Sequence, residues 1–329
     1  MEGEIDMNTK KVRWGIIGCG DVTEVKSGPA FYKLENSELV AVMRRSRELA
    51  KDYAERHGVA KWYDNADALI NDPEVDAVYI ATPPNSHKAY TIKVAEAGKP
   101  VYVEKPMALN FEECQEMIAA CKKAGVPLFT AYYRRALESF VKIKDLLNEG
   151  LIGDIRFVSV KHYQKASESL TNAWRTDPAV AGGGLLFDLG SHTLDVLDYL
   201  LGPIKEAKGF SSNQAGSYAA EDIVSGTFLF ESGVHGVGNW CFSANEDIEV
   251  NEIVGSKGKI VFSTFNMDSI KLVTESETKE FNFNVPEHIQ QPLIEKIVND
   301  LLGNGVSPSI GESAARTNWI MDKLINRIS

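Results

Sequence analysis

Short apolar runs alternate with amphipathic stretches through the first part of the chain. The apolar runs occupy residues 12–17, 38–43, 77–81, 101–103 and 127–131, and helical patterns fill residues 47–57, 88–97 and 111–124. A glycine closes each helical pattern, at positions 58, 98 and 125, which is typical of a helix C-terminus. Strands that alternate with helices predict a parallel, doubly wound sheet, that is, an α/β Rossmann fold.

The pattern changes after residue 135. Helical patterns at residues 136–149 and 186–201 accompany strand patterns at 155–162, 223–230, 233–242, 248–254, 259–262 and 269–274. Successive strands with short turns predict a large, mostly antiparallel open sheet. Two more helices are expected at residues 287–302 and 312–328. We therefore expect an α/β domain over residues 1–134 and an α+β domain over residues 135–329.

Charge and composition argue against several classes of function. The 329 residues carry a formal net charge of −11, so no basic field attracts nucleic acid. No run of about 18 apolar residues predicts a membrane span, and the polar, acidic first residues are unlike a signal peptide. We expect a cytoplasmic protein. The cysteines form neither a CxxC pair nor a cluster with histidine, so we expect no disulfide and no metal site: Cys19, Cys114, Cys121 and Cys241.

A glycine turn follows the first strand, in the context of a dinucleotide-binding motif. Gly18 permits a tight turn, and Gly20 lets the backbone approach a pyrophosphate near a helix N-terminus. Thr23 stands where a third glycine is usual, and this departure should loosen the packing of helix against strand. The cofactor contacts expected here are Gly18, Cys19, Gly20, Asp21 and Val22, with Cys19 as a small side chain in a crowded turn and no redox role.

The second strand ends in cationic residues. Arg44, Arg45 and Ser46 follow it, without the carboxylate that would bind a ribose 2′-hydroxyl. Guanidinium groups form paired, charge-assisted hydrogen bonds with phosphate. We therefore expect NADP(H) in preference to NAD(H). The alternative is a pair of solvated arginines at a strand end.

Three motifs, in this order, resemble the Gfo/Idh/MocA family of nicotinamide-dependent sugar oxidoreductases. They are residues 12–23, residues 101–107 (VYVEKPM) and residues 182–195 (GGGLLFDLGSHTLD). The resemblance spans nearly the whole chain. It implies that the first domain binds the dinucleotide and that the second binds substrate and forms oligomers. It also implies further cofactor contacts: Thr82, Pro83, Pro84, Asn85, His87, Glu104, Lys105, Arg134, Trp174 and Arg175.

Some of these residues have simpler roles as alternatives. His87 can be a structural residue at a helix start, and surface salt bridges can account for Arg134 with Arg135 and for Arg175. In the family, the free face of the second sheet pairs with another subunit, giving a homodimer or a dimer of dimers. Recurring aromatic residues favour this over a solvated face: Phe228, Phe230, Trp240, Phe242 and Phe262.

The candidate catalytic residues lie in the second and third motifs. Pro106 prevents simple continuation of the strand at residues 101–103, so Lys105 lies at the mouth of the sheet, where open α/β folds bind ligands. Asp188 and His192 are four residues apart and share one face of a helix. The three glycines at 182–184 would let the backbone run close to a ligand, whereas Asp195 is expected on the helix surface.

Hydride transfer to a carbonyl places negative charge on oxygen, which a lysine can stabilise and protonate. Histidine exchanges protons near neutral pH. By resemblance, His192 is the general acid/base, Asp188 binds substrate hydroxyls and Lys105 completes the site.

These features predict an NADP(H)-dependent oxidoreductase acting on a sugar, cyclic polyol or related polyhydroxy carbonyl compound. The resemblance leaves two alternatives. One is an NAD-dependent glycosidase that oxidises its substrate transiently, and the other is a non-enzymatic regulator that binds the dinucleotide. The complete set of Lys105, Asp188 and His192 favours an enzyme, because a regulator needs none of them.

Overall fold

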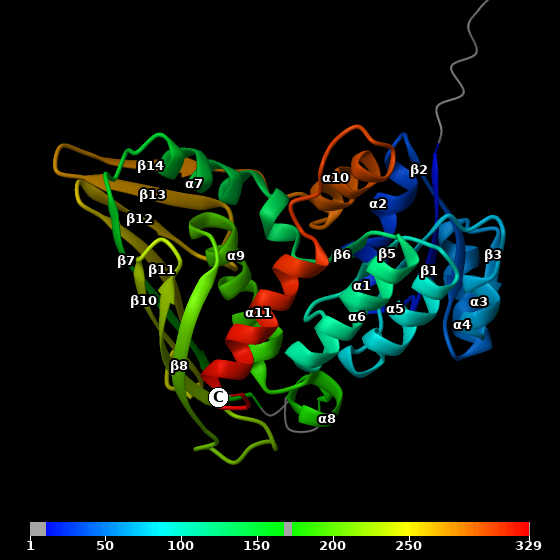
Figure 1. Cartoon of the computed structure of the whole chain (residues 1–329), viewed down its shortest axis with the longest axis horizontal. Helices are drawn as coiled ribbons and strands as arrows, with labels where there is room; N and C mark the ends of the chain where they lie inside the picture. The colour runs from blue at the N-terminus through cyan, green and yellow to red at the C-terminus, as the bar shows by residue number, and fades with distance from the viewer. Residues whose placement is uncertain (1–10, 168–172, 329) are drawn as a thin grey trace, which may run out of the picture.

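Two sheets dominate the protein, which we describe from a computed structural model of residues 11–167 and 173–328 (Figure 1). The first sheet is parallel, in the order β3 (Lys61–Tyr63), β2 (Ser37–Met43), β1 (Val12–Ile17), β4 (Ala77–Ile80), β5 (Val101–Val103) and β6 (Leu128–Thr130). Strand order changes direction between β1 and β4. The carboxyl ends of β1, β4 and β5 therefore border one crevice, the usual ligand position in such sheets.

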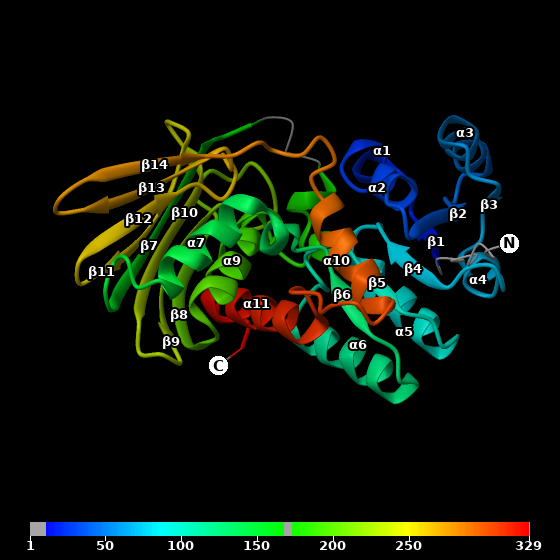
Figure 2. The same cartoon turned by 90° about the horizontal axis from the view of Figure 1, so that it is seen from above.

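Helices cover both faces of this sheet. After the short α1 (Asp21–Val25), one face packs on α2 (Gly28–Lys33), α3 (Arg47–His57) and α10 (Gln291–Leu301), and the other packs on α4 (Ala66–Ile70), α5 (His87–Glu96), α6 (Phe111–Ala124) and α11 (Gly311–Leu324). Figure 2 shows α11 beside α6. Because α10 and α11 come from the end of the chain, the core of the first unit is not built from residues 1–134 alone.

The second sheet has eight strands and is antiparallel except for the β7–β10 pair. Its order is β14 (Thr278–Asn282), β13 (Ser269–Thr274), β12 (Gly258–Phe262), β11 (Ile248–Gly255), β7 (Ile155–Lys165), β10 (His235–Ala244), β9 (Ile223–Phe230) and β8 (Ile204–Ser212). Figures 1 and 2 show α7 (Glu138–Asn148), α9 (Ser191–Leu201) and α11 on the side that faces the parallel sheet. The predicted fold class is confirmed.

The five aromatic residues that were singled out from the sequence do not lie on the outer face of this sheet. Phe228, Phe230, Trp240, Phe242 and Phe262 are each at most 3% exposed and pack in one core with residues of α7 and α9. The argument that linked them to a second subunit is therefore wrong, because their side chains contact helices of their own chain. The opposite positions carry half-buried apolar side chains: Phe157, Tyr163, Leu229 and Val237.

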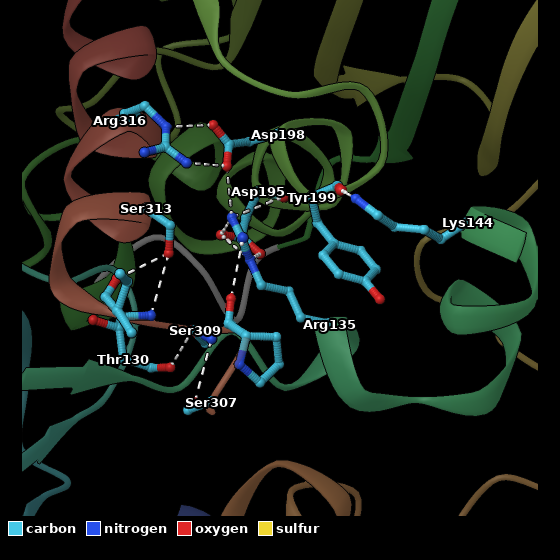
Figure 3. A network of polar contacts seen from close by, with 12 residues as sticks. Thr130, Arg135, Lys144, Asp195, Asp198, Tyr199, Ser307, Ser309, Ser313 and Arg316 are labelled. Carbon is cyan, nitrogen blue, oxygen red and sulfur yellow. Dashed lines mark hydrogen bonds and ion pairs between the residues drawn. The ribbon is translucent and has the colours of Figure 1, made fainter. Parts of the chain in front are cut away.

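A buried network of ion pairs joins the two units (Figure 3). Arg135, just after β6, donates to Asp195 from Nε at 2.9 Å and from Nη2 at 2.7 Å, and to Asp198 from Nη2 at 2.9 Å. Arg316 of α11 donates to Asp198 from Nε at 2.6 Å and from Nη2 at 2.7 Å. Asp195 is 1% exposed, so its expected position on the helix surface is wrong. These four residues, here called the Arg135 network, connect the end of the parallel sheet to α9 and α11.

All four cysteines carry free thiols, and Cys114 and Cys121 pack in the same core on one side of α6. Within the described ranges, no helix is both long and apolar enough to cross a membrane. Across the same ranges, no group of three or more histidine, cysteine and acidic side chains is arranged to hold a metal ion.

Candidate active site

The glycine turn forms an open cradle after β1. Gly18 has φ +92°, and a Cβ there would lie 2.7 Å from Thr82 Cγ2, so only glycine fits. A Cβ on Gly20 would meet nothing closer than Gly18 O at 3.9 Å, which leaves room for a ligand beside the backbone. Thr23 is fully buried, and its Oγ1 accepts from Gly20 N–H at 2.9 Å and donates to Gly20 O at 2.8 Å. It closes the turn by hydrogen bonds, contrary to the looser packing expected.

A cavity of about 610 Å³ opens beside this turn, a volume in the range of small-molecule and cofactor sites. Several predicted cofactor residues line it: Gly18, Cys19, Gly20, Arg44, Arg45, Ser46, Thr82, Pro83 and Asn85. Burial raises the pKa of the Cys19 thiol to about 11, so it is protonated at neutral pH and suits a packing role. Met43, Ala81, Ser86, Tyr90 and Val180 also line the cavity. Of these, Tyr90 lies one turn beyond His87 on α5, and this helical spacing is the sequence signal for it.

The two arginines at this cavity lack acidic partners. Arg44 is half-buried and Arg45 is exposed, and neither pairs with a carboxylate anywhere in residues 11–167 or 173–328. Ser46 acts as the N-cap of α3, because its Oγ accepts from Leu49 N–H at 3.4 Å. Two guanidinium groups therefore border the cavity at the end of β2, free to bind an anion.

Two predicted cofactor residues are held inside the protein. His87 is fully buried, and its ring nitrogens lie 2.7 Å from Thr82 O and 3.1 Å from Pro106 O. The Glu104 carboxylate accepts from Tyr79 Oη at 2.5 Å and from Gln290 Nε2 at 2.7 Å. Neither side chain lines the cavity. Both already form hydrogen bonds with neighbouring groups of the protein. Their positions fit structural roles, and for His87 this is the alternative stated above. Asp21, Val22 and Pro84 do not line the cavity either.

Lys105 and Asp188 form the centre of the candidate site. Lys105 lies two residues after the end of β5. Its Nζ donates to Asp188 Oδ1 and to Asp188 O, both at 2.7 Å. Arg175 Nε lies 3.4 Å from Asp188 Oδ2. Burial alone would raise the pKa of Asp188, but the charges of Lys105, Arg175 and Lys26 outweigh it and lower that pKa. Asp188 is thus a carboxylate held among cations.

The segment that carries Asp188 differs from the predicted single helix. Residues Leu186–Gly190 form a π-helical turn that leads into α9 at Ser191, a deviation frequent at functional sites. The preceding glycines approach protein atoms: a Cβ on Gly182, which has φ +88°, would lie 2.5 Å from Leu109 O. At these glycines the backbone therefore packs closely against neighbouring segments of the chain. The structure does not support the close approach of this backbone to a ligand that was inferred from the sequence.

His192 lies in the first turn of α9 in an aromatic enclosure. It is 5% exposed, and its Nδ1 has no hydrogen-bond partner in the part of the chain that the structure describes. The rings of Tyr132, Tyr133 and Phe265 stand edge-on to it, with centroids at 6.1, 5.6 and 6.1 Å. Burial, followed by the positive charges of Arg134, Lys105 and Lys26, lowers the pKa of His192 well below its usual value. The imidazole is therefore neutral at neutral pH.

Arg134 turns toward the second sheet, in contrast to the cofactor contact expected. Its Nε donates to Thr264 O at 2.7 Å, and its guanidinium lies over the rings of Tyr133 and Phe265 at 4.9 and 4.8 Å. It is 3% exposed, and among the described residues its Nη1 has no hydrogen-bond partner. Arg175 stacks on Trp174 at 4.4 Å. Arg134 therefore contacts the same aromatic rings as His192, and Arg175 lies beside Asp188.

Comparison with known proteins places this arrangement in a family. Residues 12–132 match the model described as oxidoreductase family, NAD-binding Rossmann fold, and residues 140–261 match the GFO/IDH/MocA C-terminal domain. The chain is 42% identical over 316 residues to Oxidoreductase P35 of Formosa agariphila, covering 95% of this chain and 98% of that protein. The chain belongs to the Gfo/Idh/MocA family. It is a nicotinamide-dependent oxidoreductase, as the sequence motifs predicted.

Two other members of the family are informative. The chain is 31% identical over 251 residues to 1,5-anhydro-D-fructose reductase of Ensifer adhaerens, which covers 76% of this chain and 75% of that protein. The solved structure of aldose-aldose oxidoreductase from Caulobacter crescentus, complexed with glycerol, matches 96% of each chain with a TM-score of 0.85 and 27% identity.

Proposed function

We propose that this protein transfers a hydride between NADP(H) and a hydroxyl-bearing carbon of a sugar or cyclic polyol. One observation carries the proposal: the Lys105 ammonium is fixed at the carboxyl end of β5 by Asp188, which lies four residues before His192 in the turn that leads into α9. The similarity to a reductase of 1,5-anhydro-D-fructose and to an aldose-aldose oxidoreductase supports a polyhydroxy substrate.

The residues around the cavity fit a dinucleotide. The open backbone at Gly20 would take the pyrophosphate, and Arg44 and Arg45 would bind a ribose 2′-phosphate. Thr82 and Asn85 would border the riboses. When bound, the nicotinamide supplies or accepts the hydride.

The catalytic roles follow from charge and burial. Lys105 donates to the substrate oxygen and stabilises negative charge that develops on it. The neutral His192 accepts the hydroxyl proton during oxidation and returns it during reduction. Asp188 orients Lys105 and accepts hydrogen bonds from substrate hydroxyls. Each group acts at the same substrate oxygen or its neighbour, so the three should behave as one unit.

We also propose that the outer face of the second sheet pairs with another copy of the chain, in a dimer or dimer of dimers. The support is the row of half-buried Phe157, Tyr163, Leu229 and Val237, since exposed apolar patches often mark interfaces. Sedimentation analysis of the wild type and of a Val237→Glu variant tests this. A wild-type monomer would refute it.

A cytoplasmic location is likewise our proposal. It is supported by the four free thiols, since reducing compartments keep cysteines unpaired. Fractionation of the native host cell with marker enzymes tests it, and recovery with extracytoplasmic markers would contradict it.

The direct test of function is a spectrophotometric assay of nicotinamide reduction and oxidation. A panel of aldoses, cyclic polyols and glycosides is offered with NADP⁺ or NAD⁺, using Lys105→Met as the matched control. Substrate-dependent reduction of NADP⁺ that disappears in the control supports the proposal. Glycoside release without net change in the nicotinamide, or no response to any polyol, contradicts it.

A further inference from the structure

The loop that carries Lys105 depends for its position on side chains from other parts of the chain. Residues 104–110, here called the Lys105 loop, lie between β5 and α6 and form neither helix nor strand. Buried backbone groups need hydrogen-bond partners, and the carbonyl oxygens of residues 106–109 each lie within hydrogen-bonding distance of a side chain. The three side chains are His87, Asn318 and Arg327. The position of the loop is therefore set by α5 and by the end of the chain.

Of these three side chains, Arg327 also contacts the residues that lead from Gly182 to Asp188, here called the Asp188 segment. Its Nη1 donates to Leu109 O at 2.9 Å, and its Nη2 donates to Gly182 O. Its guanidinium carbon lies 5.1 Å from the centre of the Phe187 ring, directly before Asp188 in the chain. One guanidinium group thus joins the Lys105 loop to the Asp188 segment.

Arg327 is itself held by the end of α11. Its backbone N–H donates to Asp322 O at 2.8 Å, and its Nη1 donates to Asp322 Oδ1 at 2.6 Å. The Asp322 side chain is 1% exposed, and its Oδ2 accepts from Phe111 N–H at 2.8 Å, at the start of α6. A guanidinium group can bind two carbonyls and a carboxylate at once, because it presents several donors in a fixed plane. The end of α11 therefore holds this guanidinium in place.

The Lys105 loop and the Asp188 segment are joined at two places. The Lys105 ammonium contacts Asp188 at 2.7 Å, and Arg327 makes its contacts four residues after Lys105 and six residues before Asp188. The two backbones pack closely there, since a Cβ on Gly182 would lie 2.5 Å from Leu109 O. Misplacement of a catalytic group by about 1 Å can lower a rate by about a hundredfold. The contacts of Arg327 therefore bear on where Lys105 and Asp188 lie.

From these contacts we infer that Arg327 is a positioning residue for the reaction, one that sets the relative position of Lys105 and Asp188 without touching the reacting atoms. The inference rests on the proposed function and adds a residue to it. The Arg327 side chain is 32% exposed, and the alternative is that it only anchors the last residues of the chain. An anchor would affect stability alone, whereas a positioning residue affects kcat of the folded enzyme.

The test compares Arg327→Ala with Asn326→Gly, a variant of the neighbouring residue. Asn326 Nδ2 donates to Gly209 O of β8 at 3.0 Å, and its φ is +61°, which glycine adopts readily. Asn326→Gly therefore removes a contact of the same terminal residues without changing the Lys105 loop or the Asp188 segment. Kinetics are measured with a compound that the wild type oxidises, taken from the panel of aldoses and cyclic polyols, and circular dichroism checks folding.

In Arg327→Ala we expect kcat to fall by about tenfold through a slight displacement of Lys105. The Kd of NADP(H) should stay within about twofold of the wild type, because the glycine turn and the arginines after β2 are unchanged. Asn326→Gly should keep the wild-type kcat. An unchanged kcat in Arg327→Ala, an equal loss in Asn326→Gly, or a loss that appears mainly in the Kd of NADP(H) would overturn the inference.

Amide hydrogen exchange gives a second measurement that does not depend on turnover. Exchange reports local opening of the backbone, so residues 105–111 and 182–188 should both exchange faster in Arg327→Ala than in the wild type or in Asn326→Gly. If no compound is turned over, the proposed function itself fails, and exchange then decides whether Arg327 fixes these residues. Faster exchange in both ranges supports this, and faster exchange in one range or in neither refutes it.

Discussion

Two groups of polar residues, most of them buried, meet at α9, and they differ in how fully their hydrogen bonds are satisfied. In the Arg135 network, two arginines share two aspartates over distances of 2.6–2.9 Å. Next to it, Arg134 and His192 are buried to a similar degree, yet Arg134 Nη1 and His192 Nδ1 have no hydrogen-bond partner among residues 11–167 and 173–328. The pairs Arg134/Arg135 and His192/Asp195 are close in sequence, but each pair divides between the two groups.

This difference suggests separate roles for the two groups, one in stabilising the fold and the other in the reaction. A satisfied network of buried ion pairs is strongly destabilised by loss of one member, because the remaining charges are left unpaired. An unsatisfied buried polar atom already costs about 1–3 kcal/mol in the folded protein, so its presence calls for an explanation such as ligand binding. We therefore assign the joining of the two units to the Arg135 network, and the chemistry to His192 with Lys105 and Asp188.

The largest effect is expected on stability from Arg135→Met. This change leaves Asp195 and Asp198 buried with less compensation, and we expect a loss of about 3–5 kcal/mol in the free energy of unfolding. Urea denaturation measures it. Arg156→Met, which removes an exposed arginine that pairs with Asp154, should cost at most about 1 kcal/mol. Equal costs for the two variants would mean that the network does not join the units.

Removal of the side chains proposed to be catalytic should affect turnover with little effect on folding. Lys105→Ala and His192→Ala should each lower kcat by about a hundredfold or more, the scale of general acid/base and electrostatic catalysis. The double variant should lose much less than the product of the two, because both groups act in one transition state. Circular dichroism and NADP(H) binding serve as controls. Strictly multiplicative losses would separate the residues into independent roles.

The preference for NADP(H) over NAD(H) should depend on Arg44 and Arg45, which line the cavity. Arg45→Ala should weaken NADP(H) binding by about tenfold, the lower end for a hydrogen bond to a charged group because Arg45 is exposed, and should leave NAD(H) nearly unchanged. Arg47→Ala is the matched control, since Arg47 lies two residues on and already pairs with Asp64. Fluorescence titration gives the Kd values. A similar loss for both cofactors would exclude recognition of the 2′-phosphate by Arg45.

The smallest effect concerns pH. His192 has a folded-state pKa well below the unfolded value of about 6.5. The unfolded state therefore takes up the proton first as pH falls, and the stability contributed by neutral His192 is present above about pH 6.5 and lost below it. The Tm of the wild type should drop more between about pH 7 and about pH 5 than that of His192→Asn. An equal or larger drop in the variant would contradict a buried, neutral histidine.

The strands could be predicted from the sequence where both faces of the sheet are buried, because such strands are continuous apolar runs. The strands β1, β2, β4 and β5 read as apolar runs, because helices cover both faces of the parallel sheet. The strands that the sequence did not reveal, β3, β8 and β14, all lie at sheet edges. Most of their residues are polar or at least partly exposed; in β14, Phe281 alone is half-buried and the other four residues are exposed. Such strands carry little periodic signal.

The candidate site was predictable only in part. Lys105, Asp188 and His192 could be proposed from the sequence because each lies in a motif, at a strand end or a helix start. The sequence could not show that Arg134 and Arg135 separate into different environments, because this depends on α9 and the second sheet packing against them.

The central claim is tested most directly by one paired measurement on α9. His192→Asn and Asp195→Asn change residues three positions apart on this helix, and both kcat and the free energy of unfolding are measured for each. We predict that His192→Asn loses turnover by about a hundredfold or more while its stability changes by less than about 1 kcal/mol. Asp195→Asn should lose about 3 kcal/mol of stability and keep turnover within a few fold of the wild type. A reversed pattern, or loss of both properties in both variants, would contradict the division between the two groups.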